Sequence, residues 1–213
     1  MGRRFDALTA DNVGQLPPPC RSCVLWELGN RSPDAASKDG WISAVLLNWG
    51  NCGQIAYVDG RVAGFAFYAP PEYVEGLGFL STAAISSDAV LLMTMRLLPG
   101  QAGSGLGRVL IQTVVKDLMR RRVKAIEAFG DMHGNENQCL IPARFLTAVG
   151  FKTVQPHPRY PRMRLELRNV LTWRDDVELA VERWLGAIRP HSVRPETGRG
   201  PVGVSPRAEP RHE

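Results

Sequence analysis

The most informative segment of the chain is a glycine-rich stretch, Leu97-Leu98-Pro99-Gly100-Gln101-Ala102-Gly103-Ser104-Gly105-Leu106-Gly107. The continuous apolar run from Ala89 to Leu97 is typical of a central strand buried on both faces. Beyond the glycines, apolar or small residues recur at helical spacing from Leu106 to Leu118. Glycines at such a turn let the backbone approach a ligand closely, and the first amides of a helix have no partner within it. The sequence therefore predicts a phosphate-binding turn between a strand and a helix.

The spacing of these glycines fits neither of the two common nucleotide-binding loops. No Lys-Ser or Lys-Thr pair follows, as the P-loop requires. A dinucleotide-binding loop follows the first strand of a βαβ series. Here the loop comes after a hairpin, which is predicted from two β-rich runs, 54–58 and 62–68, joined by Asp59-Gly60.

The remaining pattern predicts a mixed α/β sheet with one parallel crossover. We expect a strand from Phe5 to Thr9, a helix from Lys38 to Trp49 and a long loop from Glu72 to Ser87. The expected later elements are strands at 123–129, 151–154 and 163–167, a short helix at 142–149 and an amphipathic helix at 174–185.

Composition narrows the class of partner. The chain has 213 residues and a net charge of +5, so an anionic partner such as nucleic acid, a membrane surface or a phosphorylated cofactor is plausible. No apolar run approaches the ~20 residues of a membrane-spanning helix, and the basic N-terminus leads into acidic residues rather than an apolar stretch. We expect a cytoplasmic protein without a membrane partner. Nucleic acid is not favoured, because no reading motif is recognisable.

Four cysteines are present, and two of them, Cys20 and Cys23, have the spacing of half a zinc site. The others, Cys52 and Cys139, stand alone, and no histidine pair completes a site. Packed or weakly redox-active thiols are therefore preferred over a metal, and no metal is predicted.

Two segments of the chain carry a family resemblance. The stretch from Leu97 to Leu110 resembles motif A of the GNAT N-acetyltransferase superfamily, and Ala143 to Phe151 resembles its motif B, which closes in Gly-Phe. The hairpin with Val62-Ala63-Gly64-Phe65 resembles the family's second and third strands. The resemblance covers about Asp39 to Leu167. It implies a single α/β domain with a mostly antiparallel mixed sheet, a central splayed parallel strand pair and flanking helices.

We expect the chain to divide into four parts, of which the resemblance explains only the central one. Residues 1–37 form an N-terminal strand and extended segment packed on the core, and 38–170 form the GNAT-like domain. Residues 171–188 form a C-terminal helix, and 189–213, rich in proline and polar residues, form a disordered tail. The helix around Trp184 could pack on the domain or on a second copy, as in a homodimer.

The resemblance also implies a cofactor and a reaction. Acetyl-CoA is the expected acyl donor, with its pyrophosphate on the loop amides and its pantetheine along the preceding strand. The acceptor is a primary amine of a small molecule, a peptide or a protein lysine, which attacks the thioester directly while a strand amide polarises the carbonyl. The expected cofactor-binding residues are Met95, Leu97, Gln101, Ala102, Gly103, Ser104, Gly105, Leu106, Gly107 and Arg108.

Two positions depart from the family pattern. Ala102 occupies the usual Arg/Gln position of motif A, and Leu146 occupies the position of the Tyr that often serves as general acid. A non-catalytic acyl-CoA-binding regulatory protein is therefore the alternative function. Turnover separates the two, since such a protein would bind acetyl-CoA without releasing CoA.

Three residues are candidates for catalysis, each with an alternative interpretation. Glu127 could accept the amine proton, or be a solvent-facing strand carboxylate. Cys139, near the usual Asn of motif B, could lie by the CoA sulfur or be a buried packing thiol. Tyr160 could edge the acceptor pocket or anchor its loop. The acidic residues that could favour a cationic acceptor are Glu72, Glu75, Asp88 and Glu127.

Overall fold

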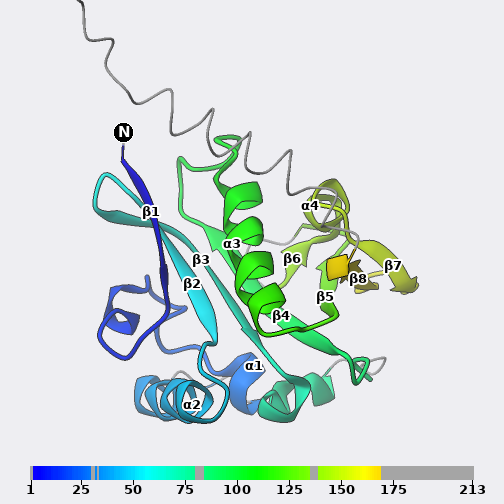
Figure 1. The fold of residues 1–213 in the computed structure, drawn as a ribbon, viewed down its shortest axis with the longest axis horizontal. Helices are drawn as coiled ribbons and strands as arrows, with labels where there is room; N and C mark the ends of the chain where they lie inside the picture. The colour runs from blue at the N-terminus through cyan, green and yellow to red at the C-terminus, as the bar shows by residue number, and fades with distance from the viewer. Residues whose placement is uncertain (1, 30–31, 33, 80–83, 135–138, 169–213) are drawn as a thin grey trace, which may run out of the picture.

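The computed structural model describes residues 2–29, 32, 34–79, 84–134 and 139–168, and their strands form one sheet (Figure 1). The strand order is β1-β2-β3-β4-β5-β8-β7, and β6 pairs with β5. Only the β4–β5 and β5–β6 pairs are parallel. The strands are β1 Arg3–Ala7, β2 Gly53–Val58, β3 Arg61–Ala69, β4 Ala89–Leu97, β5 Ala125–Asp131, β6 Ile141–Pro142, β7 Lys152–Gln155 and β8 Arg162–Glu166. The predicted fold class, a mostly antiparallel mixed sheet with a central parallel pair, is confirmed.

Helices cover both faces of this sheet. The α-helices are α1 Leu25–Leu28, α2 Ala35–Asn48, α3 Leu106–Arg120 and α4 Ala143–Ala148, and the 3-10 helices are η1 Val13–Gln15, η2 Pro71–Tyr73 and η3 Glu75–Phe79. On one face, Leu110 of α3 and Leu146 of α4 pack in one core with Leu92 of β4. On the other face, Val45 of α2 packs in a second core with Leu91 of β4. Strand β4 is thus buried on both faces, as its apolar run predicted.

Two of the element boundaries that differ from the expectation have a clear local reason. Strand β1 ends at Ala7, because it pairs antiparallel along β2 from Arg3, opposite Val58, to Ala7, opposite Gln54. Helix α2 begins at Ala35 rather than Lys38, because the Asp34 side chain accepts a hydrogen bond from the Ser37 amide at 3.1 Å and caps the helix.

Several expectations concern other parts of the chain. The described part of the predicted loop at 72–87 contains η3 and most of η2. The predicted C-terminal helix at 171–188, with Trp184, and the tail at 189–213 lie outside the described residues. Among the helices that are described, none combines the length and apolarity needed to cross a membrane.

Candidate functional site

The central strands β4 and β5 pair only near their first residues. Ala89 pairs with Ala125, and the last pair along the strands is Leu91 with Glu127, although β4 continues to Leu97. On its other edge β4 remains paired with β3, except at a bulge where Met93 has no partner. One edge of β4 beyond Leu91 is therefore not paired with β5.

The backbone groups on this edge are those of Met95 and Leu97. The Leu98 amide donates to the Ala63 carbonyl of β3 at 2.9 Å. Because backbone groups point alternately to the two sides of a strand, the N–H and C=O groups of Met95 and Leu97 point away from β3. They can bond to an extended ligand as they would to an added strand.

The loop after β4 bends through three glycines with positive φ. Gly100, Gly103 and Gly105 have φ of 82°, 75° and 77°, a region that favours glycine. A Cβ placed on Gly103 or Gly105 would meet no atom within 4 Å, so this side of the loop is open. The Ser104 hydroxyl stabilises the loop. It donates a hydrogen bond to the Gln101 carbonyl at 2.7 Å and accepts one from the Leu106 amide at 3.3 Å.

The open side of the loop carries unsatisfied donors. Within the described residues, the amides of Gly103, Gly105, Gly107 and Arg108 have no hydrogen-bond acceptor. They lie at the N-terminus of α3, where the helix dipole adds partial positive charge. The Arg3 guanidinium, donating to the Ser104 carbonyl at 3.4 Å, brings a full positive charge to the same loop. A diphosphate satisfies both the donors and the charge.

The acetyltransferase (GNAT) family model matches residues 19–145, which is more than half of the chain. This chain belongs to the acetyltransferase (GNAT) family. The predicted resemblance and the expected class of enzyme, an acyltransferase, are thereby confirmed. No curated protein sequence matches the chain.

Solved structures share the fold of this GNAT protein. The Salmonella typhimurium protein YncA, solved with its cofactor acetyl-CoA, is 16% identical with a TM-score of 0.57, covering 78% of this chain and 95% of that chain. An aminoglycoside acetyltransferase in complex with coenzyme A is 17% identical with a TM-score of 0.56, covering 81% and 99%. A ribosomal-protein-alanine N-acetyltransferase from Brucella melitensis is 16% identical with a TM-score of 0.53, covering 76% and 99%.

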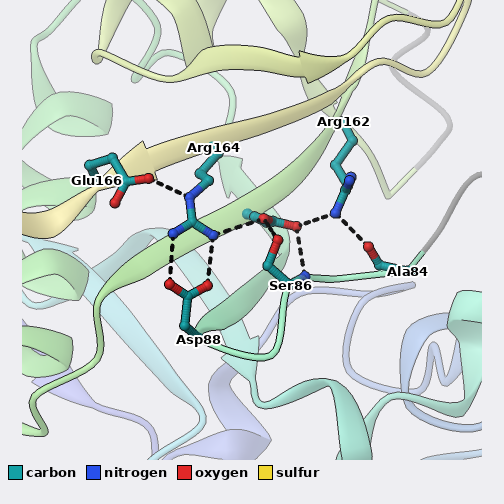
Figure 2. Close-up of polar contacts among 7 residues, drawn as sticks. Ala84, Ser86, Asp88, Arg162, Arg164 and Glu166 are labelled. Atoms are coloured by element: carbon teal, nitrogen blue, oxygen red, sulfur yellow. Dashed lines mark hydrogen bonds and ion pairs between the residues drawn. The ribbon is translucent and has the colours of Figure 1, made fainter.

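Glu127 of this GNAT protein lies in an ion-pair network. Its side chain is 0% exposed, so the interpretation as a solvent-facing carboxylate is wrong. The carboxylate accepts hydrogen bonds from the Ser86 hydroxyl at 2.6 Å, from Arg162 at 2.8 Å and from Arg164 at 3.1 Å. Figure 2 shows both arginines extending from β8 toward the segment before β4, where Ser86 lies. The network therefore joins β8 to that segment.

The same network determines the charge of Glu127. Burial alone would raise the pKa of Glu127, but hydrogen bonds from Ser86 and Arg164 and the charge of Arg162 outweigh it and lower the pKa. A carboxylate stabilised in this way is a weak base, so the contacts favour a structural role over the predicted proton transfer. Arg164 also binds both oxygens of Asp88, at 2.9 and 3.1 Å. The two carboxylates are thus occupied by arginines, which argues against their expected use for a cationic acceptor.

We expect Glu127→Gln to lower the free energy of unfolding by about 2 kcal/mol at pH 7, because it weakens hydrogen bonds to charged groups. The folded pKa is depressed, so the stabilisation by the carboxylate is complete above its unfolded pKa, about 4.3, and is lost as pH falls through the folded value. The difference between wild type and variant, measured by urea unfolding, should shrink below about pH 4. Glu166→Gln is the control, because Glu166 also binds Arg164 but is 47% exposed, and it should cost at most ~1 kcal/mol. A difference for Glu127→Gln that is independent of pH would contradict the ion-pair role.

The other two catalytic candidates lie on the α2 face of the sheet. The sulfur of Cys139, which is half-buried, lies 3.6 Å from the sulfur of Cys23. The Tyr160 amide donates to Nδ1 of His157 at 2.8 Å, and the two rings stack with centroids 6.1 Å apart. Both contacts are with a residue of the same loop, so they favour the interpretation that Tyr160 anchors this loop.

A buried ion pair on this face could not be predicted from the sequence pattern. Lys38 donates to Glu27 at 2.5 Å, and both side chains are only 4% exposed. With Cys23 and Cys139, they line a small cavity that also reaches Thr94 of β4, whose hydroxyl is buried and without a described partner. A lysine in the first turn of a helix normally extends into solvent, so its burial depends on the tertiary structure.

A larger cavity, about 250 Å³, lies at the end of β5 beside α4. Its lining includes Asp131, His133 and Arg144 but no residue of the glycine loop. Asp131 lies beyond the predicted end of this strand at 129, but it is the last residue of β5 and accepts a hydrogen bond from the His133 amide at 2.9 Å. Among the described side chains, no group of three or more His, Cys, Asp and Glu could hold a metal ion.

Proposed function

We propose that this GNAT protein binds acetyl-CoA and transfers its acetyl group to a primary amine. The observation that carries the proposal is the set of unpaired amides at Gly103, Gly105, Gly107 and Arg108, next to an unpaired edge of β4. In this proposal the amides bind the diphosphate of the cofactor. The pantetheine arm pairs with the backbone of β4, at Met95 and Leu97.

The rest of the loop supports this binding through its backbone. Ala102 offers no side-chain donor where motif A usually has Arg or Gln, so the proposal assigns that contact to main-chain groups between Gln101 and Leu106. The hydroxyl of Ser104 is already committed to the loop itself. Arg3, from β1, donates to the Ser104 carbonyl and so adds a side-chain positive charge to the loop.

The proposed reaction is direct attack of the amine on the thioester. The bulge at Met93 interrupts the β3–β4 pairing close to where the β4–β5 pairing ends, and an amide of β4 there would polarise the thioester carbonyl. Orientation of the two reactants supplies several kcal/mol of barrier reduction. Glu127 is assigned to the ion-pair network, whereas Cys139 is proposed to lie near the CoA sulfur. An amine that arrives deprotonated needs no strong base.

Turnover with a panel of amines tests this function. We expect release of free CoA that depends on the added amine, at least tenfold above hydrolysis of acetyl-CoA alone, together with an acetylated product seen by mass spectrometry. The panel contains small polyamines, free peptide N-termini and lysine-containing peptides, because the proposal specifies the acceptor only as a primary amine. If the protein binds acetyl-CoA but releases no CoA with any amine, the result would instead support a non-catalytic regulatory protein. Leu146, which stands where the family often has its general-acid Tyr, is the residue that favours this alternative.

A further inference from the structure

Two thiols far apart in the sequence meet on the α2 face. Cys23 precedes α1 and Cys139 precedes β6, 116 positions later, yet their sulfur atoms lie 3.6 Å apart. Both residues are half-buried rather than fully enclosed. The adjoining cavity, about 10 Å³, has room for about one water-sized molecule. The two thiols are therefore in contact, only partly buried and next to a small cavity.

The two thiols are chemically unequal. The hydrogen bond between the two thiols lowers the pKa of Cys23, against the opposing effect of burial. The same hydrogen bond and burial raise the pKa of Cys139. A backbone hydrogen bond at Leu25 also lowers the pKa of Cys23, whereas the charges of Glu27 and Lys38, which form an ion pair, act in opposite directions. A lowered pKa at Cys23 beside a raised pKa at Cys139 is the arrangement of a reactive and a resolving cysteine.

The other two cysteines lack this arrangement. Cys20 is buried and its sulfur accepts from Arg96 at 3.6 Å, on β4. Cys52 is 0% exposed, and burial raises its pKa to about 12. Cys20 and Cys23 are close in the sequence, but the thiol that contacts Cys23 in the structure is that of Cys139.

We propose that Cys23 and Cys139 form an oxidation site that closes to a disulfide with hydrogen peroxide. The Cys23 thiolate attacks one peroxide oxygen, the O–O bond breaks, and hydroxide leaves and takes the Cys139 proton to become water. The Cys139 sulfur then attacks the Cys23 sulfenic acid, and the hydroxide that leaves takes a proton from solvent. In sum, two thiols and one peroxide give one disulfide and two waters. The site shares Cys139 with the proposed acetyl transfer, but its chemistry uses neither acetyl-CoA nor an amine, so oxidation of the cofactor-free protein tests it separately.

The experiment oxidises the full chain and maps its disulfides. The reduced protein is treated with a few equivalents of hydrogen peroxide at pH 7, alkylated, digested and analysed by mass spectrometry. We expect a Cys23–Cys139 cross-linked peptide as the main product, reversed by a dithiol. The long loop that it closes should raise the thermal midpoint by roughly 5–15 °C.

Variants provide the controls. Cys52→Ser should leave the cross-link unchanged, and Cys23→Ser should remove both the cross-link and the rise in midpoint. The wild-type map is decisive even if Cys23→Ser folds poorly. A Cys20–Cys23 disulfide as the main product, or over-oxidised Cys23 without any cross-link, would overturn the proposal.

Discussion

Replacing Gly105 with tryptophan should lower the affinity for acetyl-CoA by roughly 100-fold or more, a loss of about 2.7 kcal/mol in binding free energy. Gly105 precedes the first residue of α3, and the space beyond its Cα is open. An indole there would occupy the volume in front of the free amides of Gly103 and Gly107. Calorimetric titration of wild type and variant with acetyl-CoA measures the effect.

Gly60→Trp is the matched control for this variant. Gly60 has a φ of 79°, almost the 77° of Gly105, and is equally open, but it lies in the β2–β3 turn. Both substitutions place a side chain in the left-handed region, at a cost of about 1–2 kcal/mol in stability. Only the Gly105 variant should lose the cofactor. Wild-type affinity in the Gly105 variant would remove the assigned site.

Lys38→Met should lower the free energy of unfolding by about 3–5 kcal/mol, because it leaves the buried carboxylate of Glu27 without a counter-charge. The two side chains are 4% exposed and 2.5 Å apart, so water does not replace the lost partner. Lys38 also donates to the Cys23 carbonyl, and its amine lies 4.5 Å from the Phe67 ring centroid. It thereby attaches the segment before α1 to α2 and the sheet. Urea unfolding at pH 7 measures the loss.

Two further variants separate the charge effect from a general loss of packing. Arg21→Met removes a more exposed ion pair with Asp39, 2.7 Å long, and should cost at most ~1 kcal/mol. Adding Glu27→Leu to Lys38→Met removes both charges and should restore much of the stability. If Lys38→Met costs no more than Arg21→Met, the buried pair does not stabilise the fold as described.

The elements that sequence reasoning located well are those whose pattern has a local physical cause. The apolar run at Ala89–Leu97 gave the bounds of β4, because a strand buried on both faces excludes polar residues along its length. The glycines from Gly103 to Gly107 placed the start of α3, because only glycine adopts positive φ without strain. Asp59-Gly60 likewise placed the β2–β3 turn.

The features that sequence reasoning missed depend on contacts between distant residues. Nothing near Glu127 in the sequence indicates two arginines from β8, so its burial in an ion-pair network could not be inferred. The contact of Cys23 with Cys139 spans 116 positions for the same reason. Asp34 is different, because an Asp followed by Ser37 three positions later is a recognisable helix cap, and that signal was available.

Binding of the cofactor diphosphate by the loop amides can be tested by following the amide resonances of the glycine loop by NMR during two titrations. Coenzyme A carries the diphosphate, whereas pantetheine has the same thiol arm without it. Binding of the diphosphate by backbone amides predicts that coenzyme A shifts the Gly103, Gly105 and Gly107 resonances strongly and that pantetheine does not, with Gly60 unmoved by either. Loop resonances that ignore coenzyme A, or that respond equally to both ligands, would contradict the account.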